Sequence, residues 1–95
     1  MATYRQQRQY YNMAKRQKID VLEAVKLFQA YSIKAKIFNF YQLRLFDIES
    51  GNRWDWYHTT GSLVSDRGHG EKKMGVYRDV EDCALYIRRI EDMVN

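Results

Sequence analysis

Two histidines and one cysteine are the side chains of this sequence best suited to nucleophilic or metal chemistry. His58 precedes Thr59 and Thr60, and Cys83 lies far along the chain. Nucleophilic catalysis needs a nucleophile and a base within hydrogen-bond reach, and no catalytic motif brings such a pair together here. We therefore expect no enzyme, and we expect His58 to be a strand-end residue that hydrogen-bonds to the following turn.

The spacing of the histidines and the cysteine does not support a metal site either. His58, His69 and Cys83 lie at unrelated separations, and they do not make the tetrahedral set that zinc requires. We expect neither a metal nor another cofactor. The single cysteine excludes an internal disulfide, indicates a reducing compartment and is expected to be a small core residue.

Binding through positive charge is the chemistry that the composition favours. The net charge is +4, and residues 1–36 carry eight Lys and Arg against Asp20 and Glu23 alone. Such a segment attracts nucleic-acid phosphates or an acidic protein surface. The residues expected to bind nucleic acid or another partner are Arg5, Arg8, Lys15, Arg16, Lys18, Arg44, Arg53, Trp54, Arg67, His69, Lys72 and Lys73.

The segment 66–73, DRGHGEKK, is the most polar and glycine-rich part of the chain. Backbone amides of such a loop could form a concavity that accepts an anion, although the P-loop spacing is absent. The alternative is a mobile loop between two elements of the fold.

Two helices are expected before the central region. Residues 3–18 are rich in helix formers but have only a weak apolar stripe, which fits either a solvated helix or a partner-binding arm. Asp20 is a good N-cap, with Glu23 completing a capping-box pattern, and it begins a helix predicted over 21–32. Its predicted core face contains Leu22, Val25, Phe28 and Gln29, with Val21, Ala24 and Tyr31 beside them.

The aromatic segment 38–65 predicts antiparallel strands. Between residues 41 and 48 the better core face carries Tyr41, Leu43 and Leu45. Turns are predicted at 50–52 and 59–61, where Gly51 and Gly61 can adopt a positive φ. Trp54 and Trp56 share one strand face, which either lies under a helix or forms an exposed stacking platform.

The predicted fold is α+β: a small antiparallel sheet of three to four strands packed with helices, in the order α-α-β-β-β-α. Residues 1–18 form a basic helix or arm, and residues 19–95 form a single domain that includes a short strand over 74–77 and a last helix capped by Asp79. No apolar run approaches the length of a membrane span, so we expect no membrane partner and a cytoplasmic location. An exposed sheet edge would also permit a homodimer.

The order of a helix, three strands and a helix resembles the double-stranded RNA-binding domain. That resemblance implies a sheet backed by two helices and an RNA surface formed by the helices and a loop. The last helix here opens with Asp79-Val80-Glu81-Asp82, which is acidic where that family is basic.

The segment Trp54-Asp55-Trp56-Tyr57-His58-Thr59-Thr60-Gly61 resembles the W-x-Y-P-T-T-G hairpin of small proteins encoded by phages and mobile elements, with His58 at the position of the proline. This resemblance implies a viral accessory protein that acts in the host cytoplasm. Such proteins bind nucleic acid or inhibit a host enzyme or an antiviral system such as CRISPR. The leading expectation is nucleic-acid binding, and the alternative is inhibition of a host protein complex.

Overall fold

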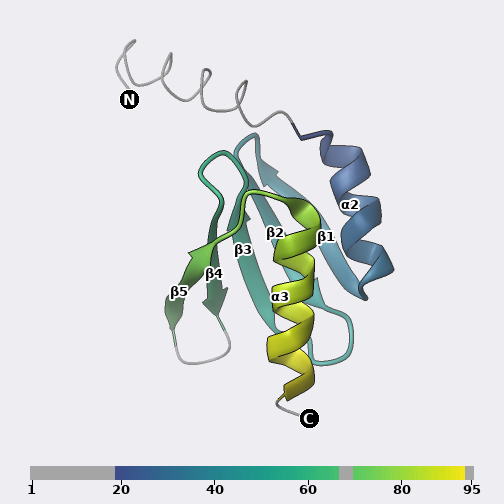
Figure 1. Ribbon diagram of the computed structural model, residues 1–95, viewed down its shortest axis with the longest axis vertical. Coiled ribbons are helices and arrows are strands. Elements are labelled where there is room, and N and C mark those ends of the chain that lie inside the picture. The colour runs from purple at the N-terminus through teal and green to yellow at the C-terminus, as the bar shows by residue number, and fades with distance from the viewer. Residues whose placement is uncertain (1–18, 67–69, 94–95) are drawn as a thin grey trace.

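The computed structural model describes residues 19–66 and 70–93 of the chain. Their elements are α2 (Val21–Ala30), β1 (Ile33–Asn39), β2 (Gln42–Asp47), β3 (Arg53–Tyr57), β4 (Ser62–Asp66), β5 (Glu71–Val76) and α3 (Val80–Met93). The strands form one antiparallel sheet in sequence order, β1-β2-β3-β4-β5 (Figure 1). The α+β class is confirmed, and the sheet has five strands rather than three or four.

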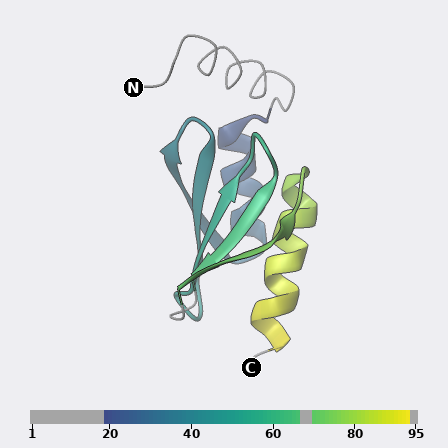
Figure 2. The same cartoon turned by 90° about the vertical axis from the view of Figure 1, so that its left-hand side faces the viewer.

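Both helices pack on one face of the sheet because the sheet carries its large apolar side chains on that face. Leu43 and Leu45 of β2, Trp54 and Trp56 of β3 and Leu63 of β4 alternate inward and are fully buried. Phe28 of α2 meets Trp56 edge-on, with ring centroids 5.7 Å apart. Tyr86 of α3 meets Trp54 in the same way at 6.4 Å. Figure 2 shows the sheet nearly edge-on with α2 and α3 against it.

The first hairpin turn, at Phe40 and Tyr41, was not predicted from the sequence. Neither residue is a glycine or a proline, so the segment reads as continuous strand. The turn is stabilised by Asn39, whose side-chain oxygen accepts a hydrogen bond from the Tyr41 amide at 3.1 Å. Asparagine favours such turns because its side-chain oxygen takes the place of a backbone carbonyl and accepts a hydrogen bond from the amide two residues on.

The two glycine turns are confirmed. Gly51 has φ +75° and Gly61 has φ +84°, a conformation that most side chains disfavour. Gly61 also lies against the chain that leads to α3, and its carbonyl accepts a hydrogen bond from the Tyr77 amide at 2.7 Å. The β3–β4 turn is therefore tied to the start of the last helix.

The predicted loop at 66–73 is corrected at both ends. Asp66 is the last residue of β4, and Glu71, Lys72 and Lys73 belong to β5. Strand pairing outweighs their polarity because their backbone groups complete the ladder with β4. Residues 67–69 lie outside the described part of the chain.

The predicted core face of α2 is wrong in part. Asp20 caps the helix as expected, since its carboxylate accepts hydrogen bonds from the amides of Leu22 and Glu23. Phe28 is buried, and so is Ala24, but Leu22 is 70% exposed. The helix lies over the edge strand β1 and beside α3, so the side that carries Leu22 extends beyond the sheet.

A buried polar cluster fixes α3 against the β2–β3 turn. Glu91 accepts hydrogen bonds from Trp54 Nε1 at 2.8 Å, Asn52 Nδ2 at 3.1 Å and Ser50 Oγ at 3.1 Å. One turn earlier, Arg88 Nη1 donates to the buried Asp47 carboxylate at 2.6 Å. Paired charges of this kind fix one arrangement of the elements, because an unpaired partner would be costly to bury.

Candidate functional site

The sheet face opposite α2 and α3 is not covered by any element of the described chain. We call it the open face and define it by the strand register, which places alternate side chains on it. Its members are Lys34, Lys36 and Phe38 of β1, Arg44 and Phe46 of β2, Arg53, Asp55 and Tyr57 of β3, Val64 and Asp66 of β4, and Glu71 and Lys73 of β5.

Ion pairs occupy the centre of the open face. Asp55 is only 2% exposed, and it accepts a hydrogen bond from Arg44 Nε at 3.0 Å. Arg53 lies 3.7 Å from the same carboxylate and donates to Asp66 at 2.6 Å. The two arginines are therefore held by neighbouring carboxylates, which reduces the charge that they can offer to a phosphate.

Three lysines surround this centre. Lys34 and Lys36 on β1 and Lys73 on β5 are exposed, and within the described residues none has a carboxylate within ion-pair distance. Lys36 Nζ lies 5.7 Å from the centroid of the Phe46 ring, a cation–π arrangement. These lysines are the cations of the open face that remain available to an anionic ligand.

Aromatic rings gather where β1 turns into β2. Phe38 is 55% exposed and Phe40 is 63% exposed, although both are large and apolar. Tyr41 meets Phe40 edge-on at 5.1 Å and stacks with Tyr57 at 6.4 Å, which extends the rings onto β3. The Arg44 guanidinium lies 4.1 Å above the Phe38 ring. Rings placed beside cations in this way can stack on nucleic-acid bases.

Trp54 is the predicted binding residue that the structure contradicts. Its side chain is fully buried under α3, and its indole N–H donates to Glu91. It is a core residue because both tryptophans lie on the sheet face that the helices cover. This is one of the two placements that the sequence allows. A surface role for Trp54 is therefore excluded.

The remaining predicted binding residues divide into three groups. Arg44 and Arg53 lie on the open face within ion pairs. Lys72 and Lys73 are both exposed, but Lys72 pairs with Ser65 and Lys73 with Val64, so they project from opposite faces of β5. The residues outside the described part are Arg5, Arg8, Lys15, Arg16, Lys18, Arg67 and His69.

The exposed lysines and rings of this site that were not selected from the sequence include Lys34, Lys36, Phe38 and Phe40. The alternation of Lys34, Lys36 and Phe38 was the available signal, because one face of a strand carries every second side chain. The missed turn at Phe40 and Tyr41 concealed the fact that these rings stand at a hairpin tip.

Within the part of the chain that the structure describes, His58 has no hydrogen-bond partner at Nε2 that could serve in catalysis. It is buried beside Trp56, its Nε2 has no hydrogen-bond partner, and burial lowers the pKa of its imidazole. The sequence predicted a hydrogen bond from His58 to the following turn, and Nε2 does not make one. Thr60 directs its hydroxyl to the Tyr57 carbonyl instead.

Cys83 is fully buried in the core, as expected, and burial raises the pKa of its thiol well above the ordinary value. Among residues 19–66 and 70–93, no three histidine, cysteine or acidic side chains are grouped to bind a metal ion. In the same residues, neither helix has the length and apolar character needed to cross a bilayer.

Comparison of the sequence with protein-family models, of the sequence with characterised proteins, and of the fold with solved structures gives no match. The function must therefore be argued from the site.

Proposed function

We propose that this protein is a non-catalytic binding protein that holds single-stranded nucleic acid across the open face. The observation that carries the proposal is the juxtaposition of unpaired lysines with exposed aromatic rings on one uncovered sheet face. Lys34, Lys36 and Lys73 would contact phosphates, and Phe38 and Phe40 would stack on bases.

A single strand fits this surface better than a duplex. Sheet platforms bind unpaired bases by stacking, whereas duplex RNA is read by elements that reach across its grooves. The first turn of α3 carries Glu81 and Asp82, which would repel a phosphate backbone brought to that helix. The ion pairs of Arg44 and Arg53 would hold the centre of the face flat and leave its rims to the ligand.

The basic residues of 1–18 remain part of the proposal on the strength of their sequence. Their five Lys and Arg would add phosphate contacts to those of the open face. A role as a phage or mobile-element accessory protein in the host cytoplasm agrees with the hairpin resemblance.

The charge contribution can be measured by fluorescence anisotropy with a labelled single-stranded 12-mer over a range of salt concentrations. Log Kd should depend linearly on log salt, with a slope of about 0.7 per neutralised phosphate. The double variant Lys34→Ala/Lys36→Ala should weaken binding and reduce the slope by about 1.4. A slope unchanged from that of the parent protein would contradict the assignment.

The matched control removes two equal charges elsewhere. Lys26 on α2 and Arg89 on α3 are exposed and lie on the helical side of the molecule. The variant Lys26→Ala/Arg89→Ala should reproduce the parent slope. An equal loss in both double variants would show that binding follows net charge rather than the open face.

A second candidate is a protein-binding inhibitor of a host enzyme or an antiviral system such as CRISPR. The specific observation is the exposed apolar tip formed by Ile37, Phe38 and Phe40, because exposed aromatic groups are frequent anchors of protein interfaces. A complex that survives nuclease treatment and is lost in Phe38→Ser/Phe40→Ser would favour this candidate over nucleic-acid binding.

A further inference from the structure

The outer edge of β1 carries backbone groups that the described sheet leaves unpaired. Asp47 exchanges hydrogen bonds with Asn52 and Gly51 on the β3 side, and the Ile48 amide donates to Ser32 on the β1 side. The N–H and C=O groups of successive residues point to opposite sides of a strand. Those of Phe46 and Arg44 therefore also point towards β1, where they bond to the register partners Lys34 and Lys36.

The backbone groups of the intervening β1 residues must therefore point away from β2. The N–H and C=O groups of Ile33, Ala35 and Ile37 face away from β2, at the end of the strand order. An edge of this kind can accept another strand through main-chain hydrogen bonds.

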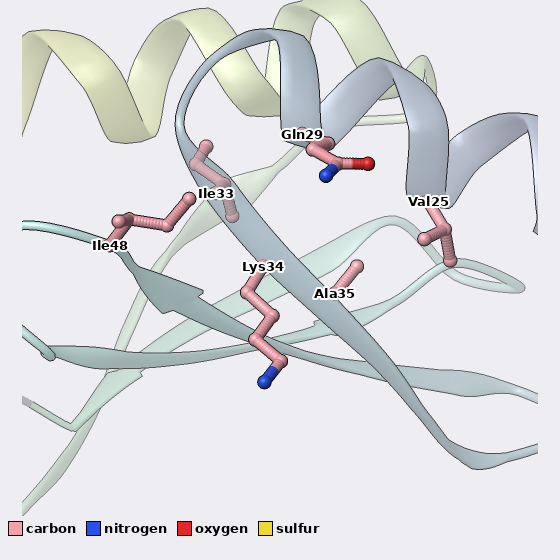
Figure 3. A pocket seen from close by; sticks show the side chains of 6 residues that line it. All are labelled: Val25, Gln29, Ile33, Lys34, Ala35 and Ile48. Atoms are coloured by element: carbon pink, nitrogen blue, oxygen red, sulfur yellow. The ribbon is translucent and has the colours of Figure 1, made fainter.

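A groove accompanies this edge on the helical side of the sheet. It encloses about 310 Å³ and is lined by Val25 and Gln29 of α2, by Ile33, Lys34 and Ala35 of β1 and by Ile48. Figure 3 shows Ile33 and Ala35 directed to the side of β1 on which α2 lies, and Lys34 directed away from it.

Leu22 extends the apolar side of this groove along α2. Leu22, Val25 and Gln29 follow the i, i+3, i+7 spacing that places residues on one helix face. These are three of the residues that the sequence predicted to be core. Val25 and Gln29 line the groove, so the helix face that also carries Leu22 borders the open strand edge.

The two sides of the edge require different side chains from an added strand. A residue opposite Ala35 would direct its side chain into the groove and meet the apolar groups of Val25, Ile33 and Ile48. Its two neighbours would point to the other side, beside Lys34 and Lys36. The complementary pattern is therefore acidic, apolar, acidic.

We propose that the β1 edge is a docking site for an extended acidic peptide, which adds as a sixth strand with an apolar side chain in the groove and carboxylates beside Lys34 and Lys36. A second copy of this chain is a poorer occupant, because antiparallel pairing of two β1 edges centred on Ala35 places Lys34 of one copy opposite Lys36 of the other. Lysines at sheet edges oppose such self-pairing. The proposal does not depend on the nucleic-acid function.

Amide hydrogen exchange followed by NMR tests the pairing residue by residue. The probe is the acetylated and amidated heptapeptide Glu-Val-Glu-Val-Glu-Val-Glu, added to the full chain. Exchange at Ile33, Ala35 and Ile37 should slow by about tenfold or more at saturation, whereas Lys34 and Lys36, already bonded to β2, should change little. Protection confined to other parts of the chain, or no protection, would overturn the proposal.

Two altered probes and one altered protein separate pairing from charge attraction. N-methylation of the valines removes the amides that would face β1 and should weaken binding by at least about tenfold, whereas N-methylation of the glutamates should have little effect. Lys34→Glu/Lys36→Glu should release the glutamate peptide and bind the corresponding Lys-Val peptide. Equal effects of the two methylations would exclude strand addition. An oligonucleotide on the open face would not protect the amides of Ile33, Ala35 and Ile37, so this result stands apart from the proposed function.

Discussion

At the scale of single residues, Glu91 connects two elements of the described fold. Its carboxylate receives donors from Ser50, Asn52 and Trp54 and so joins α3 to the β2–β3 turn. This role could not be predicted from the sequence, because a glutamate near the end of an amphipathic helix is normally exposed.

Glu91→Gln should therefore destabilise the fold. The substituted amide presents N–H groups to side chains that also donate, so at least one buried donor loses its acceptor at a cost of about 1–3 kcal/mol. The midpoint of urea unfolding should decrease accordingly. Asp92→Asn is the control, since Asp92 is exposed and its ion-pair partner among the described residues is Arg88, one turn earlier, and it should change stability much less.

His58 should make stability depend on pH between neutral and mildly acidic conditions. Burial lowers the pKa of His58 in the fold from its ordinary 6.5, so the folded state favours the neutral ring. As the pH falls below that value, the unfolded chain takes up the proton first, and the free energy of unfolding decreases. His58→Gln should flatten the unfolding curve between pH 7 and pH 5, and an unchanged pH dependence would contradict the assignment.

Asp47 affects the free energy of unfolding in a separate and more acidic pH range. Burial alone would raise its pKa, but hydrogen bonds from Ser50 and Arg88 outweigh that effect and hold the pKa below the ordinary 3.8. Its contribution is fully present above 3.8 and is lost as the pH falls through the lowered value. The two groups can therefore be distinguished in one titration.

At the scale of elements, the sequence predicted what local chemistry determines. The Asp20 cap, the turns at Gly51 and Gly61 and the placement of both tryptophans on one strand face all follow from single residues or from strict alternation. The turn at Phe40 and Tyr41 was not predictable in the same way, because it depends on one Asn39 side-chain hydrogen bond within a strand-like sequence.

The errors in α2 and β5 have a different cause. The periodicity of Leu22, Val25 and Gln29 predicts an apolar face, but only the position of α2 over the sheet edge determines how far that face is covered. Glu71 and Lys73 read as loop because they are polar, whereas an uncovered sheet face accepts polar side chains without cost. Both features are tertiary and do not appear in local sequence.

Substitution of the two turn glycines should separate backbone strain from crowding. A Cβ at Gly61 would lie 2.9 Å from the Tyr77 carbonyl oxygen, whereas one at Gly51 would meet nothing within 4 Å, and both residues have positive φ. Gly51→Ala should cost about 1 kcal/mol from strain alone, and Gly61→Ala should cost clearly more. Thermal unfolding of the two variants measures the difference, and equal losses would contradict the packing of Gly61 against Tyr77.

At the scale of the whole molecule, the fold is a sheet with helices on one face and charge on the other. The sequence analysis selected Trp54 for the surface, whereas the structure buries Trp54 and exposes Phe38 and Phe40. Strand alternation identifies two faces without stating which one the helices cover, and that choice decides which rings a ligand can reach.

The most direct test of nucleic-acid binding on the open face is a map of backbone amide shifts in the ¹H–¹⁵N spectrum as an unlabelled single-stranded 12-mer is added. We expect the largest changes on β1, the β1–β2 turn and β3, including Lys36, Phe38, Phe40 and Tyr57, and little change at the exposed residues of α2 and α3. Changes centred on the two helices, or an unchanged spectrum at saturating oligonucleotide and low salt, would contradict it.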